Sequence, residues 1–270
     1  MGLATLLGPR PQGFFIPYRY AGTLPAAGAH AGYAALTPHF AAAEPTFEAH
    51  LAAIETLAAD LAAISGSAPA PRFDQDWFPT LDAAAAYALV RQRRPASVVE
   101  IGSGHSTRFL ARAVADGGLS TRIAAIDPAP RAALEGLAVE MHRRALAEVD
   151  PGIFESLAPG DMLLVDSSHV LMPGSDVDEV LNRILPLLPA GVLVHFHDVF
   201  LPDDYPQAWA WRGYNEQNAL GPLIAGGGWH LLFASHYVAT RMAERLAASV
   251  VARLPSAAGA YPASLWLEKR

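Results

Sequence analysis

The chain has 270 residues, a formal net charge of −7 and no cysteine. The acidic balance argues against nucleic acid as the main partner, and the lack of cysteine excludes disulfides and thiolate chemistry. No stretch approaches the roughly 20 uninterrupted apolar residues of a membrane-spanning helix, and residues 1–10 lack the basic start and long apolar core of a signal peptide. We therefore expect a cytoplasmic protein with no membrane partner.

Residues 1–75 differ in character from the rest of the chain. Residues 11–20 are aromatic and punctuated by proline, which is typical of an extended or looped segment. From residue 45 to residue 64 the apolar side chains recur at the spacing of one helix face: Phe47, Leu51, Ile54, Leu57, Leu61 and Ile64. We interpret residues 1–75 as an N-terminal lid of helix and loop, packed on a main domain that spans residues 76–270.

The main domain begins with a predicted helix near residues 80–94, which leads into a short apolar run at residues 96–101. A tight turn, Gly102-Ser103-Gly104, follows, and helical periodicity resumes from Thr107. Strand, glycine-rich turn and helix form the opening unit of a nucleotide-binding α/β fold. The third glycine of a dinucleotide fingerprint is missing, because Thr107 stands in its place, and a carboxylate, Glu100, lies just before the turn.

This stretch resembles the Glu/Asp-x-Gly-x-Gly motif of class I S-adenosylmethionine-dependent methyltransferases. The resemblance implies that the turn passes under the methionine portion of S-adenosylmethionine, with Glu100, Gly102, Ser103, Gly104 and Ser106 as cofactor-binding residues. A glycine-rich turn without a ligand is the alternative that the motif alone leaves open.

The second predicted strand, residues 122–126, ends in an acidic residue. In nucleotide-binding α/β domains an acid at the end of this strand, about 20 residues past the glycines, bonds the ribose hydroxyls. Asp127 has that position, and a capping role before Pro128 is compatible with it. A helix over residues 129–136 and a third strand over residues 137–142 are expected next.

Polar residues follow the fourth and fifth predicted strands, residues 162–165 and 191–196. Asp166 and His169 come after the fourth strand, and His197 and Asp198 after the fifth. Ligands of open α/β sheets bind at the carboxyl edge of the strands. We therefore expect these four side chains to meet where the chemistry occurs.

The order of these residues resembles metal-dependent O-methyltransferases of the same class. That resemblance implies that Asp166 and Asp198 hold Mg²⁺ or another divalent cation, and that His169, three residues after Asp166, acts as the catalytic base. The residue beside Asp198 departs from the pattern, because His197 stands where an acid or amide is expected, and imidazole is a softer ligand than Mg²⁺ prefers. Another divalent metal, a supporting role for His197, and no metal at all stay open.

The C-terminal part completes the expected fold. Residues 201–212 form a loop over the active edge, in which Trp209 and Trp211 are suited equally to substrate contact and to packing. Strands are predicted at residues 229–235 and 264–268. The fold class is therefore α/β, a Rossmann-like, doubly wound sheet of seven mostly parallel strands with an antiparallel last strand, plus the N-terminal lid.

The function that fits this reading is methyl transfer from S-adenosylmethionine to a hydroxyl of a small molecule, such as a sugar or natural product. His169 takes the proton, and Asp166, His197 and Asp198 form the candidate metal set. An NAD(P)-dependent oxidoreductase and a non-catalytic, cofactor-binding partner protein are the alternatives. A homo-oligomer stays open.

Overall fold

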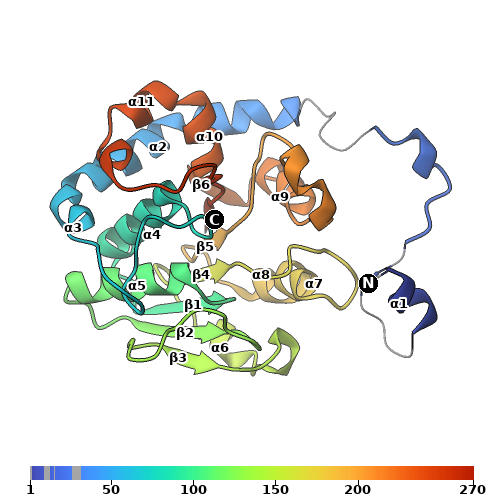
Figure 1. The fold of residues 1–270 in the computed structure, drawn as a ribbon, viewed down its shortest axis with the longest axis horizontal. Helices are drawn as coiled ribbons and strands as arrows, with labels where there is room; N and C mark the ends of the chain where they lie inside the picture. Colours follow the sequence, from blue (N-terminus) through green and yellow to red (C-terminus); the bar gives the residue numbers. More distant parts are fainter. Residues whose placement is uncertain (1, 9–12, 15, 26–31) are drawn as a thin grey trace.

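The computed structural model describes residues 2–8, 13, 14, 16–25 and 32–270, and within them seven strands form one sheet of order β3-β2-β1-β4-β5-β7-β6 (Figure 1). Only β7 runs antiparallel to its neighbours, β5 and β6, whereas the other pairings are parallel. The strands are β1 (Ser97–Ile101), β2 (Arg122–Ile126), β3 (Glu140–His142), β4 (Met162–Val165), β5 (Leu193–Phe196), β6 (Trp229–Ala234) and β7 (Leu265–Lys269). The predicted fold class is confirmed.

Helices cover both faces of this sheet, as doubly wound folds require. The longer helices are α2 (Thr37–Thr56), α4 (Thr80–Arg93), α5 (His105–Asp116), α9 (Gln217–Ala225) and α10 (Ser235–Arg241). Short helices are α1 (Gly2–Leu7), α3 (Ala58–Ala62), α6 (Gly152–Glu155), α7 (Asp176–Glu179), α8 (Leu185–Leu187) and α11 (Ala243–Ala247). Helical turns η1 to η6 are Ala21–Thr23, Ala34–Leu36, Leu146–Glu148, Val180–Ile184, Gln207–Arg212 and Val250–Arg253.

The apolar composition of the central strands follows from their position. Every residue of β1, β4 and β5 is buried, because each lies between two parallel or antiparallel neighbours and under helices on both faces. Helix α4 is buried over Thr80–Val90 and packs between α5 and α2. Its alanines, Ala83 to Ala86 and Ala88, leave room for that close approach.

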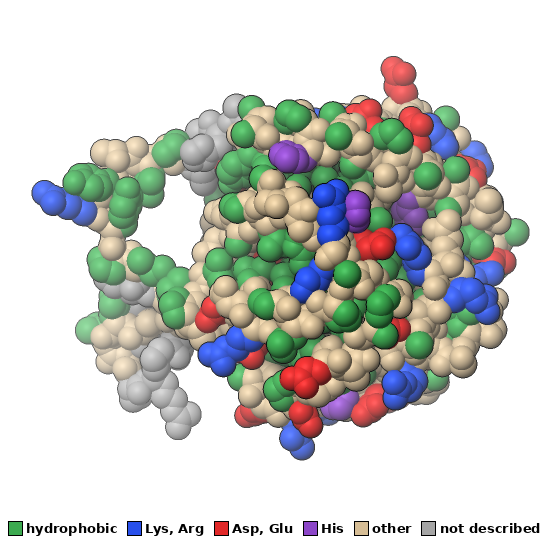
Figure 2. Space-filling model, turned by 180° about the vertical axis from the view of Figure 1, so that it is seen from behind, with side chains coloured by type: hydrophobic (Ala, Val, Ile, Leu, Met, Phe, Trp, Pro, Cys, Tyr) green, Lys and Arg blue, Asp and Glu red, His purple; other side chains and the backbone are tan. Residues whose placement is uncertain are grey.

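The N-terminal region has two parts. Helix α2 begins before the predicted start, with Pro45 inside it, and packs against β6 and α4. Its Phe47 ring meets Phe233 of β6 edge-on at 5.9 Å, so α2 shares the core of the sheet domain. The described residues 2–8 and 16–25, by contrast, stand off from the body (Figures 1 and 2) and expose apolar side chains such as Leu7 and Ile16.

The lid interpretation of residues 1–75 stays a prediction, and residues 1, 9–12, 15 and 26–31 of that stretch lie outside the described residues. None of the described helices combines the length and the apolar character that crossing a bilayer requires.

The helix predicted over residues 129–136 is wrong, since the chain forms turns and bends there. The cause is local. Pro128 and Pro130 restrict the residues before them to extended conformations and remove two amide donors. In addition, the carboxylate of Asp127 accepts a hydrogen bond from the amide of Ala129 at 2.8 Å, which favours a turn over a helix.

Candidate active site

The turn after β1 is built around Gly102, whose φ is +91°. Its amide donates to the carbonyl of Ile126 at the end of β2, at 2.9 Å. A Cβ at this position would collide with the carbonyl oxygen of Asp166 and lie 3.0 Å from the carbonyl carbon of the same residue. Only glycine therefore allows the turn to lie directly against the chain that follows β4.

Ser103 and Gly104, the next two residues of the turn, differ in their surroundings. The hydroxyl of Ser103 donates to Oδ2 of Asp127 at 2.7 Å, which joins the turn after β1 to the end of β2. At Gly104, no heavy atom of the described residues lies within 4 Å of the point where a Cβ would stand. The backbone of the turn is thus bare on the side where the resemblance places the methionine portion of S-adenosylmethionine, and the half-buried Asp127 lies beside it. These residues fit that cofactor.

Glu100 and Ser106 lie beneath the turn. Glu100 is fully buried, and its two oxygens accept hydrogen bonds from the hydroxyls of Ser106 and Thr107, both at 2.5 Å. These contacts join β1 to the first turn of α5. Burial, opposed by the two hydroxyls, raises the pKa of Glu100 to about 7. The predicted contact of Glu100 and Ser106 with the cofactor stays a prediction.

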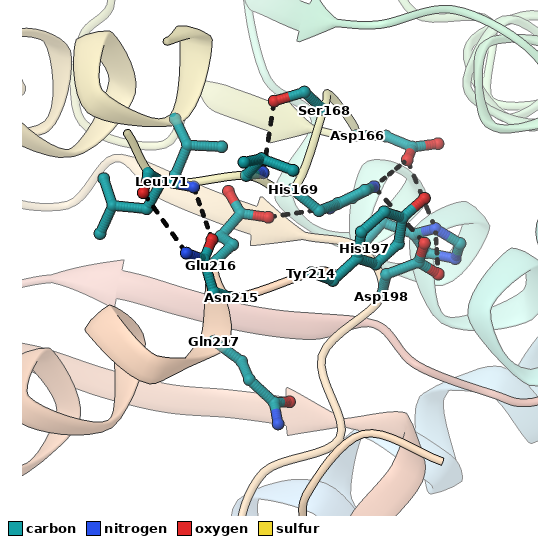
Figure 3. A network of polar contacts seen from close by, with 12 residues as sticks. Asp166, Ser168, His169, Leu171, His197, Asp198, Tyr214, Asn215, Glu216 and Gln217 are labelled. Carbon is teal, nitrogen blue, oxygen red and sulfur yellow. Dashed lines mark hydrogen bonds and ion pairs between the residues drawn. The ribbon is translucent and has the colours of Figure 1, made fainter. Parts of the chain in front are cut away.

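His169 lies at the carboxyl edge of β4 with a left-handed backbone, φ +58°. Its buried ring has a carboxylate at each nitrogen (Figure 3). Nδ1 lies 2.9 Å from Oε2 of Glu216, and Nε2 lies 3.3 Å from Oδ1 of Asp166 and 3.4 Å from Oδ2 of Asp198. The three sequence-predicted residues, Asp166, His169 and Asp198, therefore do meet.

The second imidazole, His197, is also held from both sides. Its Nδ1 faces Asp198 at 3.3 Å and Asp166 at 3.6 Å, and its Nε2 faces Oδ2 of Asp82 at 3.4 Å. Asp82, in the first turn of α4, has no exposed surface and accepts the amides of Ala263 and Ser264. Asp198, like His169, has a left-handed backbone, with φ +56°. Sparsely populated backbone conformations of this kind cluster at functional sites.

The electrostatics of this cluster favour charged imidazoles. Burial opposes the charge, but contacts with Asp166 and Glu216 and the charges of Glu216 and Asp198 raise the pKa of His169 well above 6.5. The pKa of His197 is likewise raised, against burial, by Asp198 and Asp166. Burial raises the pKa of Glu216 and of Asp198. By contrast, His195 inside β5 bonds Ser264, and burial lowers its pKa to about 3.

The residues predicted to hold a metal are gathered, but they pair with one another. Among the described residues, no group of three or more His, Cys, Asp or Glu side chains is arranged to hold a metal ion. The donor set Asp166, His197 and Asp198 therefore does not fit a coordination shell as placed.

Residues 215–217, which lead into α9, hold together the loops that follow β4 and β5. Asn215 bonds both backbone groups of Leu171, and its own amide donates to the carbonyl of His169 at 3.0 Å. Glu216 bonds the ring of His169, and Gln217 accepts from the amide of Phe200 after β5. Sequence reasoning missed Glu216, which lies 47 residues beyond His169. Asp82 falls within the helix predicted near residues 80–94, and the sequence analysis gave it no part in the site.

The sheet order, the glycine turn after β1 and the acid that ends β2 together define a class I, Rossmann-like methyltransferase architecture. A family model described as a methyltransferase domain matches residues 99–199, which run from β1 past the end of β5. This part of the chain is therefore similar to a methyltransferase domain.

Several solved structures are similar to the chain. The S-adenosylmethionine-bound O-methyltransferase TomG from Streptomyces achromogenes is 24% identical over 67% of this chain and 80% of its own, with a TM-score of 0.40. An S-adenosylhomocysteine-bound O-methyltransferase from Bacillus cereus is 16% identical over 82% and 91%, with a TM-score of 0.38. The Podospora anserina methyltransferase PaMTH1 is 15% identical over 96% and 99%, with a TM-score of 0.43. These likenesses do not bear on the substrate. Comparison with curated proteins gives no significant match.

Proposed function

We propose that this methyltransferase transfers the methyl group of S-adenosylmethionine to a hydroxyl oxygen of a small molecule, with His169 as the base. The observation that carries the proposal is the contact between two loops. Gly102 of the cofactor turn lies directly against the backbone of Asp166, and His169 follows three residues later with Nε2 beside the Asp166 carboxylate. A base and a methyl donor bound at the turn would thus share one edge of the sheet.

When bound, S-adenosylmethionine supplies an electrophilic methyl group on a sulfonium that leaves as a neutral thioether. His169 takes the proton of the acceptor hydroxyl at Nε2. With the cofactor bound, the acceptor oxygen would take the methyl group as the carbon–sulfur bond breaks, and the electron pair of that bond would stay on the leaving thioether. The proton passes from His169 to solvent. Alignment of the groups in one line supplies much of the rate in such a displacement, and proton transfer contributes about 10²–10⁴-fold.

The carboxylates around His169 determine the orientation, the tautomer and the pKa of its ring. Glu216 at Nδ1 fixes the orientation of the His169 ring and favours the tautomer whose Nε2 is free to take a proton. A base must be neutral before it acts. Because the surrounding carboxylates raise the pKa of His169, we expect methyl transfer to increase as pH rises above neutrality.

The mechanism takes no step through a metal ion, since the predicted metal ligands do not fit a coordination shell as placed. The small-molecule acceptor, a homo-oligomeric assembly, the absence of nucleic-acid and membrane partners and a cytoplasmic location stay predictions.

The test is methyl transfer from S-adenosylmethionine carrying a radiolabelled methyl group to a panel of small hydroxyl compounds. We expect label in an ether product of at least one acceptor, and a loss of about 10²-fold or more in His169→Gln. The S-adenosylhomocysteine Kd should be unchanged in that variant. His39→Gln, at an exposed position of α2, is the matched control. Transfer only to nitrogen or carbon, or full activity in His169→Gln, would contradict the proposal.

A further inference from the structure

The loop after β5 forms an aromatic wall next to the base. Trp209 in η5 meets Phe200 edge-on at 5.1 Å, Tyr261 at 5.8 Å and Tyr214 at 6.1 Å between ring centres. The Tyr214 ring in turn lies 4.6 Å from the ring of His169. The wall therefore reaches from the surface of the loop to the proposed catalytic base.

A single cation, Arg212, is set into this wall. Its guanidinium carbon lies 4.1 Å from the ring centre of Trp209, 5.3 Å from that of Tyr214 and 5.5 Å from that of Trp211. Nη1 donates to the hydroxyl of Tyr214 at 3.1 Å. Such cation–π contacts hold the guanidinium of Arg212 against the aromatic rings.

The donors of Arg212 are not used up by these contacts. Its Nε is buried without a hydrogen-bond partner, and no carboxylate among the described residues lies within 4 Å of its guanidinium. Most other buried polar atoms in proteins are paired. An arginine held on aromatic rings, with Nε unpaired and no carboxylate at its guanidinium, keeps donors for the bidentate contacts that guanidinium groups make with carboxylate and phosphate.

Arg212 lies close to the proposed catalytic base. Tyr214 contacts both the guanidinium and the His169 ring, so Arg212 stands one aromatic side chain from the base. Its charge also acts on Asp198. An anionic group bound by Arg212 would therefore lie near the proposed base.

We propose that Arg212 binds an anionic group of the methyl acceptor, so that the acceptor is a hydroxy compound carrying a carboxylate or a phosphate. The exposed indole of Trp211, with 81% of its surface accessible, supplies a flat face for the carbon skeleton of such a compound. This inference rests on the proposed function and makes Arg212 a residue that determines acceptor specificity.

The test is calorimetric titration of the protein saturated with S-adenosylhomocysteine. The probes are D-glucuronate for a carboxylate, D-glucose 6-phosphate for a phosphate, and D-glucose as the neutral control. We expect saturable binding of at least one anionic probe, at least tenfold tighter than D-glucose. The stronger of the two anionic probes identifies which anion the site takes.

Substitution then assigns the binding to one side chain. Arg212→Gln should weaken the anionic probe at least tenfold, and Arg212→Lys should retain part of the affinity because it keeps the charge but loses the fork. Arg183→Gln, an exposed arginine on η4, removes the same charge elsewhere and should change nothing. Equal binding of D-glucose, no binding of any probe, or full binding by Arg212→Gln would overturn the proposal. If the anionic probes fail but the wild-type protein binds S-adenosylhomocysteine, only the anion site is refuted and the proposed methyltransferase function stands. If the wild-type protein does not bind S-adenosylhomocysteine, the proposed function itself is refuted.

Discussion

Two glycines of one turn should respond to alanine in opposite ways. At Gly102 a methyl group collides with the backbone of Asp166, and neither of the atoms it meets can swing aside as a side chain would. The φ of +91° adds strain for any residue with a Cβ. We expect Gly102→Ala to cost about 2–4 kcal/mol of folding free energy. For a chain of this size that lowers Tm by roughly 5–15 °C.

At Gly104 the same substitution meets no neighbour and only replaces glycine by alanine at the N-cap of α5, so the cost should be about 1 kcal/mol or less and Tm should fall by no more than about 4 °C. The added methyl group would instead stand in the space assigned to the cofactor. We expect Gly104→Ala to weaken S-adenosylhomocysteine at least tenfold, which is about 1.4 kcal/mol of binding free energy. Calorimetry and thermal unfolding of both variants give the comparison. Equal loss of Tm in the two variants, or unchanged affinity in Gly104→Ala, would refute the reasoning.

Three further predictions concern buried carboxylates. Glu216→Gln removes the charge beside Nδ1 of His169 and should lower the pKa of His169, as followed by NMR titration of the imidazole; an unchanged titration would rule out the assigned contact. Asp82→Asn should cost about 1–3 kcal/mol in urea unfolding, because a neutral amide cannot replace both the backbone contacts and the charge facing His197; a smaller change would show that the contact is dispensable. Glu100 has a raised folded pKa of about 7, so its contribution to stability is complete below pH 4.5 and is lost as pH rises to 7. Glu100→Gln should therefore gain about 3 kcal/mol on the wild type between those pH values, and parallel pH profiles would contradict this.

The sheet could be predicted from local pattern because its strands are short, buried and separated by turns. The apolar runs before Gly102, Asp127 and Asp166 are each bounded by glycine, proline or an acid, and each became a strand. The failure at residues 129–136 came from underrating Pro128 and Pro130, whose effect on the preceding residues outweighs helical spacing. The early start of α2 could not be predicted, since its burial depends on β6, far along the sequence.

Some residues of the candidate site could be predicted from the sequence, and others could not. Asp166, His169 and Asp198 were predictable because the carboxyl ends of adjacent parallel strands meet at one edge. Glu216 and Asp82 were not, because each reaches the site from a helix or loop whose placement is a tertiary property. Arg212 carries no spacing signal at all. Its surroundings appear only when the loop after β5 is folded onto Tyr214 and Trp209.

The central claim is that residues 102–104 form the turn that binds S-adenosylmethionine. The measurement that tests it most directly is calorimetric titration of the purified protein with S-adenosylhomocysteine, with and without Mg²⁺ or Mn²⁺. We expect saturable binding at one site per chain with the same affinity in both conditions, because Asp166, His197 and Asp198 do not fit a coordination shell as placed. No binding by folded protein in either condition would contradict the claim.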